Sequence, residues 1–131
     1  MTYLIDTDWV VDFLSGQETA HDLIARLIPD GIAISIVTFI EVFEGIEGGR
    51  DPRDAERVFR QLLVAADVIG IGRRAARRTA QIRLELRRQG RAVNHRAFDL
   101  VIAATAMEHD LVLVTRNARH FEDIQGLRLY S

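Results

Sequence analysis

The segment LVLVTRN, residues 111–117, begins with four consecutive apolar residues and ends with three polar ones. A short run of Leu and Val that is apolar at every position predicts a strand buried on both faces of a sheet. The run YLI at residues 3–5 has the same character and stops abruptly at Asp6. Strands of this kind are typical of parallel sheets whose two faces are covered by helices.

The rest of the chain alternates between short apolar runs and segments with helical spacing. Besides residues 3–5 and 111–114, strands are predicted at residues 32–36, 68–71 and 127–130. Helices are predicted at residues 10–14, 21–28, 38–47, 54–63, 73–88 and 98–108. Thr38 and Glu41 match a capping box at the start of one of them. This alternation predicts a single three-layer α/β/α domain over residues 1–131, with a central, mainly parallel sheet.

The composition excludes several classes of enzyme. All 17 residues counted as Lys+Arg are arginines, so the chain has no P-loop lysine and no Schiff-base lysine. It has no Cys, which excludes disulfides, thiolate-bound zinc and thiol nucleophiles. With 131 residues and 48% hydrophobic residues, the chain is expected to bury a substantial core.

The formal net charge of −2 conceals an asymmetry along the chain. Residues 1–56 contain twelve acids and three arginines, whereas residues 57–131 contain seven acids and fourteen arginines. Seven of those arginines lie in the predicted helix 73–88, which indicates either an RNA-binding face, a surface paired with the acidic half, or a solvated face. No targeting segment and no membrane span is predicted, so a cytosolic protein is expected.

Polar residues follow the predicted strands at the points where a parallel sheet binds ligands. Asp6 follows the first strand, Glu41 lies one turn into the next helix, and Asp99 lies in the first turn of another. The segment Thr115-Arg116-Asn117 follows the strand 111–114. Carboxylates that converge repel one another unless a cation lies between them, and hard oxygen ligands favour Mg²⁺ or Mn²⁺. Such an ion is suited to phosphodiester hydrolysis.

Other interpretations of these residues remain open. A lone Asp at a strand end is often a helix cap, and Glu41 has its capping-box role. Asp6 and Asp8 also fit the first motif of haloacid-dehalogenase-type phosphatases, although the chain lacks the lysine that such enzymes use. Otherwise Asp8 is interpreted as a solvated acid at a helix start. Of the four histidines, only His95 and His120 are expected near this edge.

Four motifs, in order and spanning nearly the whole chain, resemble those of PIN domains, most closely those of VapC-type ribonuclease toxins. They are LIDT at residues 4–7, TxxExxxG at 38–45, DLVIAATA at 99–106 and LVTRNxxxF at 113–121. The resemblance implies a PIN fold and a Mg²⁺- or Mn²⁺-dependent endoribonuclease activity on RNA. It also implies a small VapB-type antitoxin that neutralises the toxin, and a homodimer.

Residue by residue, the resemblance places Asp6, Glu41 and Asp99 on the three acids of the family's metal site. Asn117 falls where many members have a fourth acid and is the fourth candidate catalytic residue, because its amide oxygen can still bind the ion or orient water. The amide carries no charge, which argues against a second tightly bound ion. We therefore expect one ion near Asp6 and Asp99, Glu41 orienting or activating water, and a second ion only with substrate. Arg96, Arg116 and Thr115 are the candidate substrate contacts.

Two expectations concern partners and alternatives. The antitoxin's C-terminal segment is expected to cover the acidic site and to use an apolar groove near Trp9, Phe13, Phe39 and Phe43, unless these aromatic residues belong to the core. The alternative function is a PIN-like scaffold that no longer cleaves RNA and serves in complex assembly. Asn117 keeps this alternative open.

Overall fold

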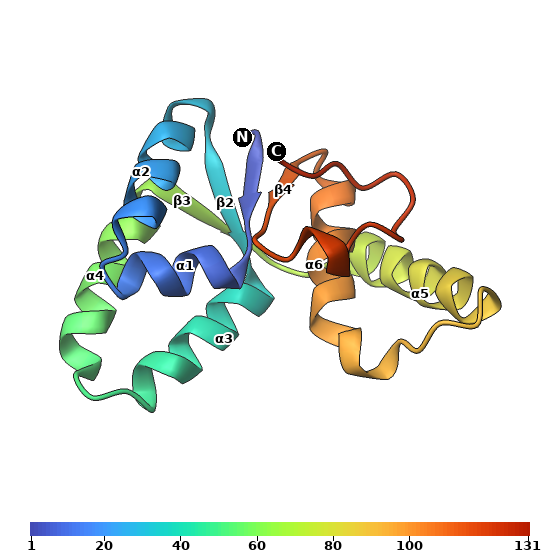
Figure 1. Ribbon diagram of the computed structural model, residues 1–131, viewed down its shortest axis with the longest axis horizontal. Helices are drawn as coiled ribbons and strands as arrows, with labels where there is room; N and C mark the ends of the chain where they lie inside the picture. Colours follow the sequence, from blue (N-terminus) through green and yellow to red (C-terminus); the bar gives the residue numbers. More distant parts are fainter.

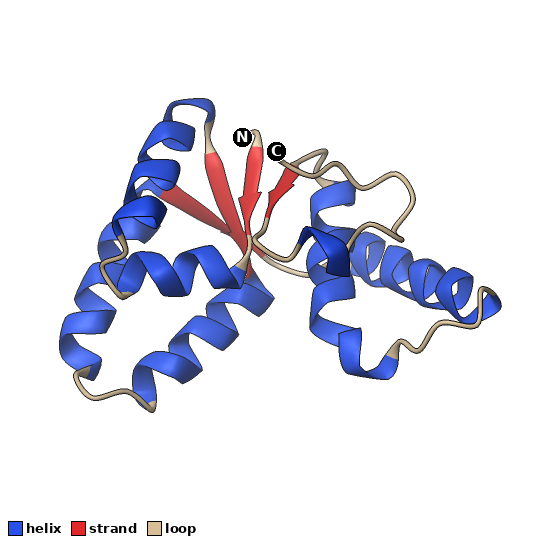
Figure 2. Ribbon diagram, in the orientation of Figure 1, coloured by secondary structure: helices blue, strands red, loops and turns tan.

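The computed structural model describes all residues, 1–131, and contains one sheet of four parallel strands (Figures 1 and 2). The strands are β1 (Tyr3–Ile5), β2 (Ile32–Ser35), β3 (Ala66–Ile69) and β4 (Val112–Val114), in the order β3-β2-β1-β4. The helices are α1 (Thr7–Leu14), α2 (Glu18–Leu27), α3 (Ile36–Glu47), α4 (Pro52–Ala65), α5 (Arg73–Arg88) and α6 (Ala97–Glu108). Three 3₁₀ turns, η1 (Ile28–Asp30), η2 (Asn94–Arg96) and η3 (Ala118–His120), complete the chain. The predicted three-layer α/β/α architecture is confirmed.

Helices cover both faces of the sheet, as Figure 1 shows. Side chains alternate along each strand, so Leu4 faces one core and Ile5 the other. Helices α5 and α6 pack on the first face, and α1 to α4 pack on the second, although Val37 at the start of α3 also contacts the first core. This burial on both faces explains why the strand segments are apolar at every position.

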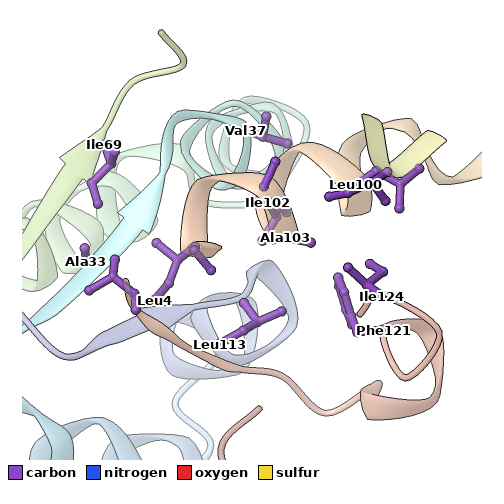
Figure 3. Packing of buried hydrophobic residues seen from close by; sticks show 14 of the residues in the cluster. Leu4, Ala33, Val37, Ile69, Leu100, Ile102, Ala103, Leu113, Phe121 and Ile124 are labelled. Atoms are coloured by element: carbon purple, nitrogen blue, oxygen red, sulfur yellow. The ribbon is translucent and has the colours of Figure 1, made fainter. Parts of the chain in front are cut away.

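The core on the α5–α6 face is closed by the end of the chain (Figure 3). Leu4 and Leu113 from neighbouring strands pack beneath Leu100 and Ile102 of α6. Phe121 is 1% exposed and packs into the same cluster. The anchored Phe121 holds the segment after β4 against α6, which places residues 115–120 beside the carboxyl ends of the strands.

Some predicted boundaries were wrong. Residues 127–130 form no fifth strand, because only Leu129 makes a bridge, to Leu113. The third strand begins at Ala66 rather than at residue 68. Helix α1 begins at Thr7 rather than at residue 10, because the Asp6 carboxylate accepts a hydrogen bond from the backbone N–H of Thr7.

The capping box predicted from Thr38 and Glu41 is also wrong. Helix α3 begins at Ile36, directly after β2, and its cap is Ser35. The Ser35 hydroxyl accepts hydrogen bonds from the backbone N–H groups of Val37 and Thr38. Glu41 is therefore one turn inside the helix, with its side chain available for other contacts. No helix of the structure has the length and apolar character needed to cross a membrane.

Candidate active site

Asp6 lies at the carboxyl end of β1, between the ends of β2 and β4, and is 5% exposed. One carboxylate oxygen accepts from the Thr7 backbone N–H at 2.8 Å, and the other accepts from the Thr115 hydroxyl at 2.7 Å. Burial, together with the nearby charges of Asp8 and Asp99, raises the pKa of Asp6 to about 6, although the hydrogen bonds from Thr115 and Thr7 oppose the rise. Asp6 is thus a buried carboxylate in a negative environment.

Asp8 is half-buried and ties the start of α1 to the segment after β4. Its carboxylate accepts from the backbone N–H of Trp9 at 2.7 Å and of Arg116 at 3.0 Å, and from the Asn117 side-chain amide at 3.3 Å. Burial raises the pKa of Asp8, while the backbone N–H groups of Arg116 and Trp9 and the Thr115 hydroxyl oppose the rise. The interpretation of Asp8 as a solvated acid is therefore wrong, because its carboxylate is half-buried and accepts hydrogen bonds from Arg116 and Asn117.

Glu41 is half-buried on α3, and its carboxylate is held by Thr7, the first residue of α1. The Thr7 hydroxyl donates to Glu41 Oε1 at 2.8 Å and lies 3.0 Å from the Thr38 hydroxyl. Because Thr7 follows Asp6 directly, this bond ties the Glu41 side chain to the start of α1, at the edge of the sheet where Asp6 lies. Thr7 is a positioning residue that the sequence reasoning missed, and the only signal for it is its place between two acids.

Asp99 is half-buried in the first turn of α6. It is close enough to Asp6 and to Arg96 for its charge to raise the pKa of both groups. The Asp99 side chain makes no hydrogen bond and no ion pair in the structure, so both of its oxygens can take a ligand. The fold therefore brings the acids from β1, α3 and α6 to one edge of the sheet.

Asn117 is exposed at the end of the segment after β4. Its backbone N–H donates to the Thr115 hydroxyl at 3.1 Å, and its side-chain nitrogen donates to Asp8. The amide nitrogen, and not the oxygen, thus points to the carboxylate that Asn117 contacts. In this arrangement Asn117 holds Asp8 rather than offering a ligand oxygen there.

The two arginines predicted to contact substrate are engaged within the protein. Arg116 forms an ion pair with Asp12 at 2.7 Å, and its guanidinium lies 3.9 Å from the centroid of the Trp9 ring. Arg96, 12% exposed, donates two hydrogen bonds of 2.8 Å to Asp123 and one of 2.7 Å to the backbone carbonyl of His120. Both arginines hold the segment after β4 in place.

The chemistry of the carboxylates fits a hard divalent cation. Asp6, Glu41 and Asp99 offer only oxygen donors, which Mg²⁺ and Mn²⁺ prefer. The raised pKa of Asp6 reflects burial and surplus negative charge, both of which a bound cation would offset. No group of three or more His, Cys, Asp or Glu side chains is already arranged as a metal cluster. The donors therefore match the ion in kind, and their side chains would have to close around it.

The arginines of α5 make few contacts with acids. Arg78 pairs with Glu108 at 2.8 Å, and Arg83 and Arg87 lie near the side-chain oxygen of Asn94. No ion pair joins α5 to residues 1–56. The interpretation in which this helix pairs with the acidic half of the chain is therefore wrong, and the RNA-binding and solvated interpretations remain.

The residues predicted to form an aromatic groove pack mainly inward. Trp9, Phe13, Phe39 and Phe43 are half-buried against the core on the α1–α4 face. A separate apolar groove of about 210 Å³ lies between α1, α3 and α4. Val11, Leu14, Val42, Ile46 and Ala55 line it.

Comparison with known proteins identifies the family of this chain and several relatives. The family model described as "PIN domain" matches residues 3–127. The chain is 33% identical over 128 residues to the tRNA(fMet)-specific endonuclease VapC of Shigella flexneri, covering 98% of this chain and 96% of the relative. It is 37% identical over 123 residues to Ribonuclease VapC19 of Mycobacterium tuberculosis, with 90% of each chain covered.

Solved structures show the same fold. The DNA-bound VapBC of Salmonella typhimurium superposes with a TM-score of 0.87 at 29% identity, covering 99% of this chain and 97% of that one. VapBC2 of Rickettsia felis, bound to a promoter DNA fragment, gives a TM-score of 0.88 at 23% identity, with 99% and 98% covered. At that identity the second likeness concerns the fold alone.

Proposed function

This chain belongs to the PIN domain family, and from this premise we propose that it is a metal-dependent endoribonuclease toxin of the VapC type. Ribonuclease relatives at 33% and 37% identity over at least 90% of the chain support the activity. The observation that carries the proposal is the meeting of Asp6, Glu41 and Asp99, from three separate elements, at the carboxyl edge of the sheet. We further propose that the nuclease domain spans residues 1–131.

Asp6 and Asp99 are the residues that would hold a Mg²⁺ or Mn²⁺ ion. When bound there, the ion supplies positive charge that offsets the charge developing on the phosphate and makes the attacking water more acidic. Asp99 brings an unpaired carboxylate, whereas Asp6 is already held by Thr7 and Thr115. The fixed Asp6 and the free Asp99 would together set where the phosphodiester binds.

Glu41 would orient the attacking water and accept its proton. Thr7 donates to one oxygen of the Glu41 carboxylate and leaves the other available. The Thr7 bond supports this role, because a general base must be held within reach of the water that it activates. Water would then attack the phosphorus in line with the leaving oxygen, which departs as the strand is cut.

Asp8, Thr115 and Asn117 would act by positioning. They form one hydrogen-bonded network that joins the end of β4 to the start of α1 and orients Asp6. This role for Asp8 replaces the haloacid-dehalogenase interpretation, which is wrong because the chain belongs to a different family and Asp8 is engaged with the 115–117 segment. The alternative of a non-cleaving assembly scaffold is favoured only by Asn117 at the position of the fourth acid.

Cleavage of RNA tests this function. The wild-type chain should cut RNA in Mg²⁺ or Mn²⁺ and stop in EDTA, and Asp99→Asn should cut far more slowly. Asp67→Asn provides a matched control, because Asp67 is an exposed acid on β3 outside the site. A wild-type chain that cuts no RNA with either ion would favour the assembly scaffold.

We also propose a VapB-type antitoxin as the partner, supported by the likeness to a VapBC complex at 29% identity. The apolar groove between α1, α3 and α4 suits the apolar face of an antitoxin segment. We propose a homodimer as the toxin's own assembly. The solution mass of the chain, alone and co-expressed with the product of an adjacent small gene, tests both; a monomer that binds no such product would contradict them.

A further inference from the structure

A cavity of about 340 Å³ lies beside Asp99 and is lined by no apolar side chain. Its walls come from the segment before α6, including η2, and from η3 and the residue Asp123 that follows it. Arginines 91, 96 and 119 and histidines 95 and 120 line it together with Asp99 and Asp123. A cavity this polar does not suit an apolar ligand, and its surplus of cationic groups suits an anion.

The charges in this cavity are only partly balanced. Arg96 and Asp123 neutralise each other through their two 2.8 Å hydrogen bonds. Arg91 approaches Asp123 only at 3.6 Å and stays 56% exposed, so it gains little from that contact. Arg119 is exposed and makes no ion pair or side-chain hydrogen bond. Two guanidinium groups are thus available to a ligand.

Arg96 has a different task in the same cavity. Its bonds to Asp123 and to the His120 carbonyl join the segment before α6 to η3. This holds the two walls at a fixed separation, so that Arg91 on one wall and Arg119 on the other face a preformed space. Arg96 is therefore a positioning residue for the cavity.

Asp99 connects this cavity to the proposed cleavage site. The residue lines the cavity and lies near Asp6 across the edge of the sheet. An RNA strand whose scissile phosphate is held at Asp6 and Asp99 carries further phosphates on either side. The cavity is the cationic space that adjoins Asp99, while the other side of the site is made of the acids themselves.

Resting on the proposed RNA cleavage, we infer that this cavity is a phosphate-binding subsite for the RNA strand next to the bond that is cut. Arg91 and Arg119 bind the phosphate oxygens, since the planar guanidinium can donate two parallel hydrogen bonds to a phosphate. His95 and His120 add ring N–H donors at the rim. The subsite contacts the phosphate backbone of the RNA, so it contributes affinity without selecting a base sequence.

The test measures binding separately from cleavage. In an Asp6→Asn background and in EDTA, fluorescence anisotropy gives the Kd for a labelled single-stranded RNA at several salt concentrations. Arg91→Gln and Arg119→Gln should each weaken binding about tenfold. Each should also make the plot of log association constant against log salt concentration less steep, reducing the magnitude of its slope by about 0.7. Arg26→Gln, an exposed arginine on α2 at the opposite face, is the matched control and should change neither value.

A kinetic measurement in the wild-type background complements the binding data. The double variant Arg91→Gln/Arg119→Gln should raise KM while kcat stays within about threefold, because a phosphate contact away from the reacting atoms contributes uniform binding. Its melting temperature should match that of the wild type, since both side chains are exposed.

The outcomes separate the two proposals. If the wild type cuts RNA but both variants bind it with unchanged Kd and salt slope, the subsite is wrong and the function stands. Variants that bind RNA normally and instead lose the co-expressed partner protein would assign the cavity to an acidic protein segment, which also overturns the subsite. If the wild type cuts no RNA, the proposed function itself fails.

Discussion

The hydroxyl of Thr115 donates a 2.7 Å hydrogen bond to Asp6 across 109 residues of sequence. It joins the ends of β4 and β1, the two strands whose pairing brings Ile5 opposite Val114. Through this bond the segment after β4 helps to keep Asp6 ionised, because a donor to a carboxylate favours its charged form. The buried Asp6 thus depends on a residue that is remote in sequence.

Thr115→Val should raise the pKa of Asp6 above its value of about 6, because the variant keeps the shape of the side chain and removes the donor. Thr115→Ser keeps the hydroxyl and should leave the pKa near 6. The carboxyl-carbon chemical shift of Asp6, followed by NMR against pH in EDTA, reports this directly. If the pKa of Asp6 is the same in Thr115→Val as in the wild type, the Thr115 hydrogen bond does not stabilise the charged form of Asp6 in solution.

Asp6→Asn should stabilise the metal-free fold at neutral pH. The pKa of Asp6 is raised in the folded state, so its ionisation costs stability: the cost is absent below about pH 3.8, grows as pH rises to about 6 and is constant above. Since one pKa unit corresponds to about 1.4 kcal/mol, the variant should gain about 1–3 kcal/mol in free energy of unfolding at pH 7.5. Asn preserves the cap of α1.

Urea unfolding in EDTA measures this gain. The difference between Asp6→Asn and the wild type should shrink as pH falls from about 6 and approach zero below about pH 3.8, where Asp6 is protonated in both states. A variant that is less stable than the wild type at pH 7.5 would contradict the prediction. Stability and catalysis are thus expected to oppose each other at Asp6.

Asp123→Asn should destabilise the fold at neutral pH and not in acid. The hydrogen bonds from Arg96 hold the pKa of Asp123 below its usual value, so the pair stabilises the fold above about pH 4 and loses that effect as pH falls through the lowered pKa. With both side chains largely buried, the loss at pH 7 should be about 1–2 kcal/mol.

The ion pair of Asp110 with Arg128 supplies the control for that prediction. The Asp110 side chain is 95% exposed, so Asp110→Asn should leave the free energy of unfolding unchanged within error. Asn also tolerates the positive φ of 55° at this position. Equal effects of the two substitutions in urea unfolding at pH 7 would show that the Arg96–Asp123 pair is no stronger than a surface pair.

The sequence predicted the elements whose burial is uniform or strongly periodic. Helix α5 has the predicted bounds, Arg73–Arg88, and the apolar strands β1 and β4 lie at adjacent positions in the sheet. Helix starts were predicted less well, because α1 and α3 follow their strands without a loop and are capped by the last strand-end residues, Asp6 and Ser35. Because the strand passes directly into the helix, the sequence has no Gly or Pro that marks the start of the helix.

The candidate site could be predicted in its acids but not in its supporting contacts. Asp6, Glu41 and Asp99 follow strands or begin helices, so their shared edge follows from the rules for parallel sheets. The partners of Asp8 and Arg96 are 108 and 27 residues away, and no periodicity links such pairs. The charge of Arg96 was visible in the sequence, but its engagement with Asp123 was not.

The proposed metal-dependent cleavage site is tested most directly by the single-turnover rate of RNA cleavage as a function of Mn²⁺ concentration, for the wild type, Asp99→Asn and Glu41→Gln. We predict that Asp99→Asn needs far more Mn²⁺ to reach half its maximal rate, since it loses a ligand. We predict that Glu41→Gln changes the Mn²⁺ concentration needed for half-maximal rate less than Asp99→Asn does. Its maximal rate should fall at least about 100-fold, since it loses the group that positions and deprotonates water. Equal rates and equal metal dependence in all three proteins would contradict the proposed site.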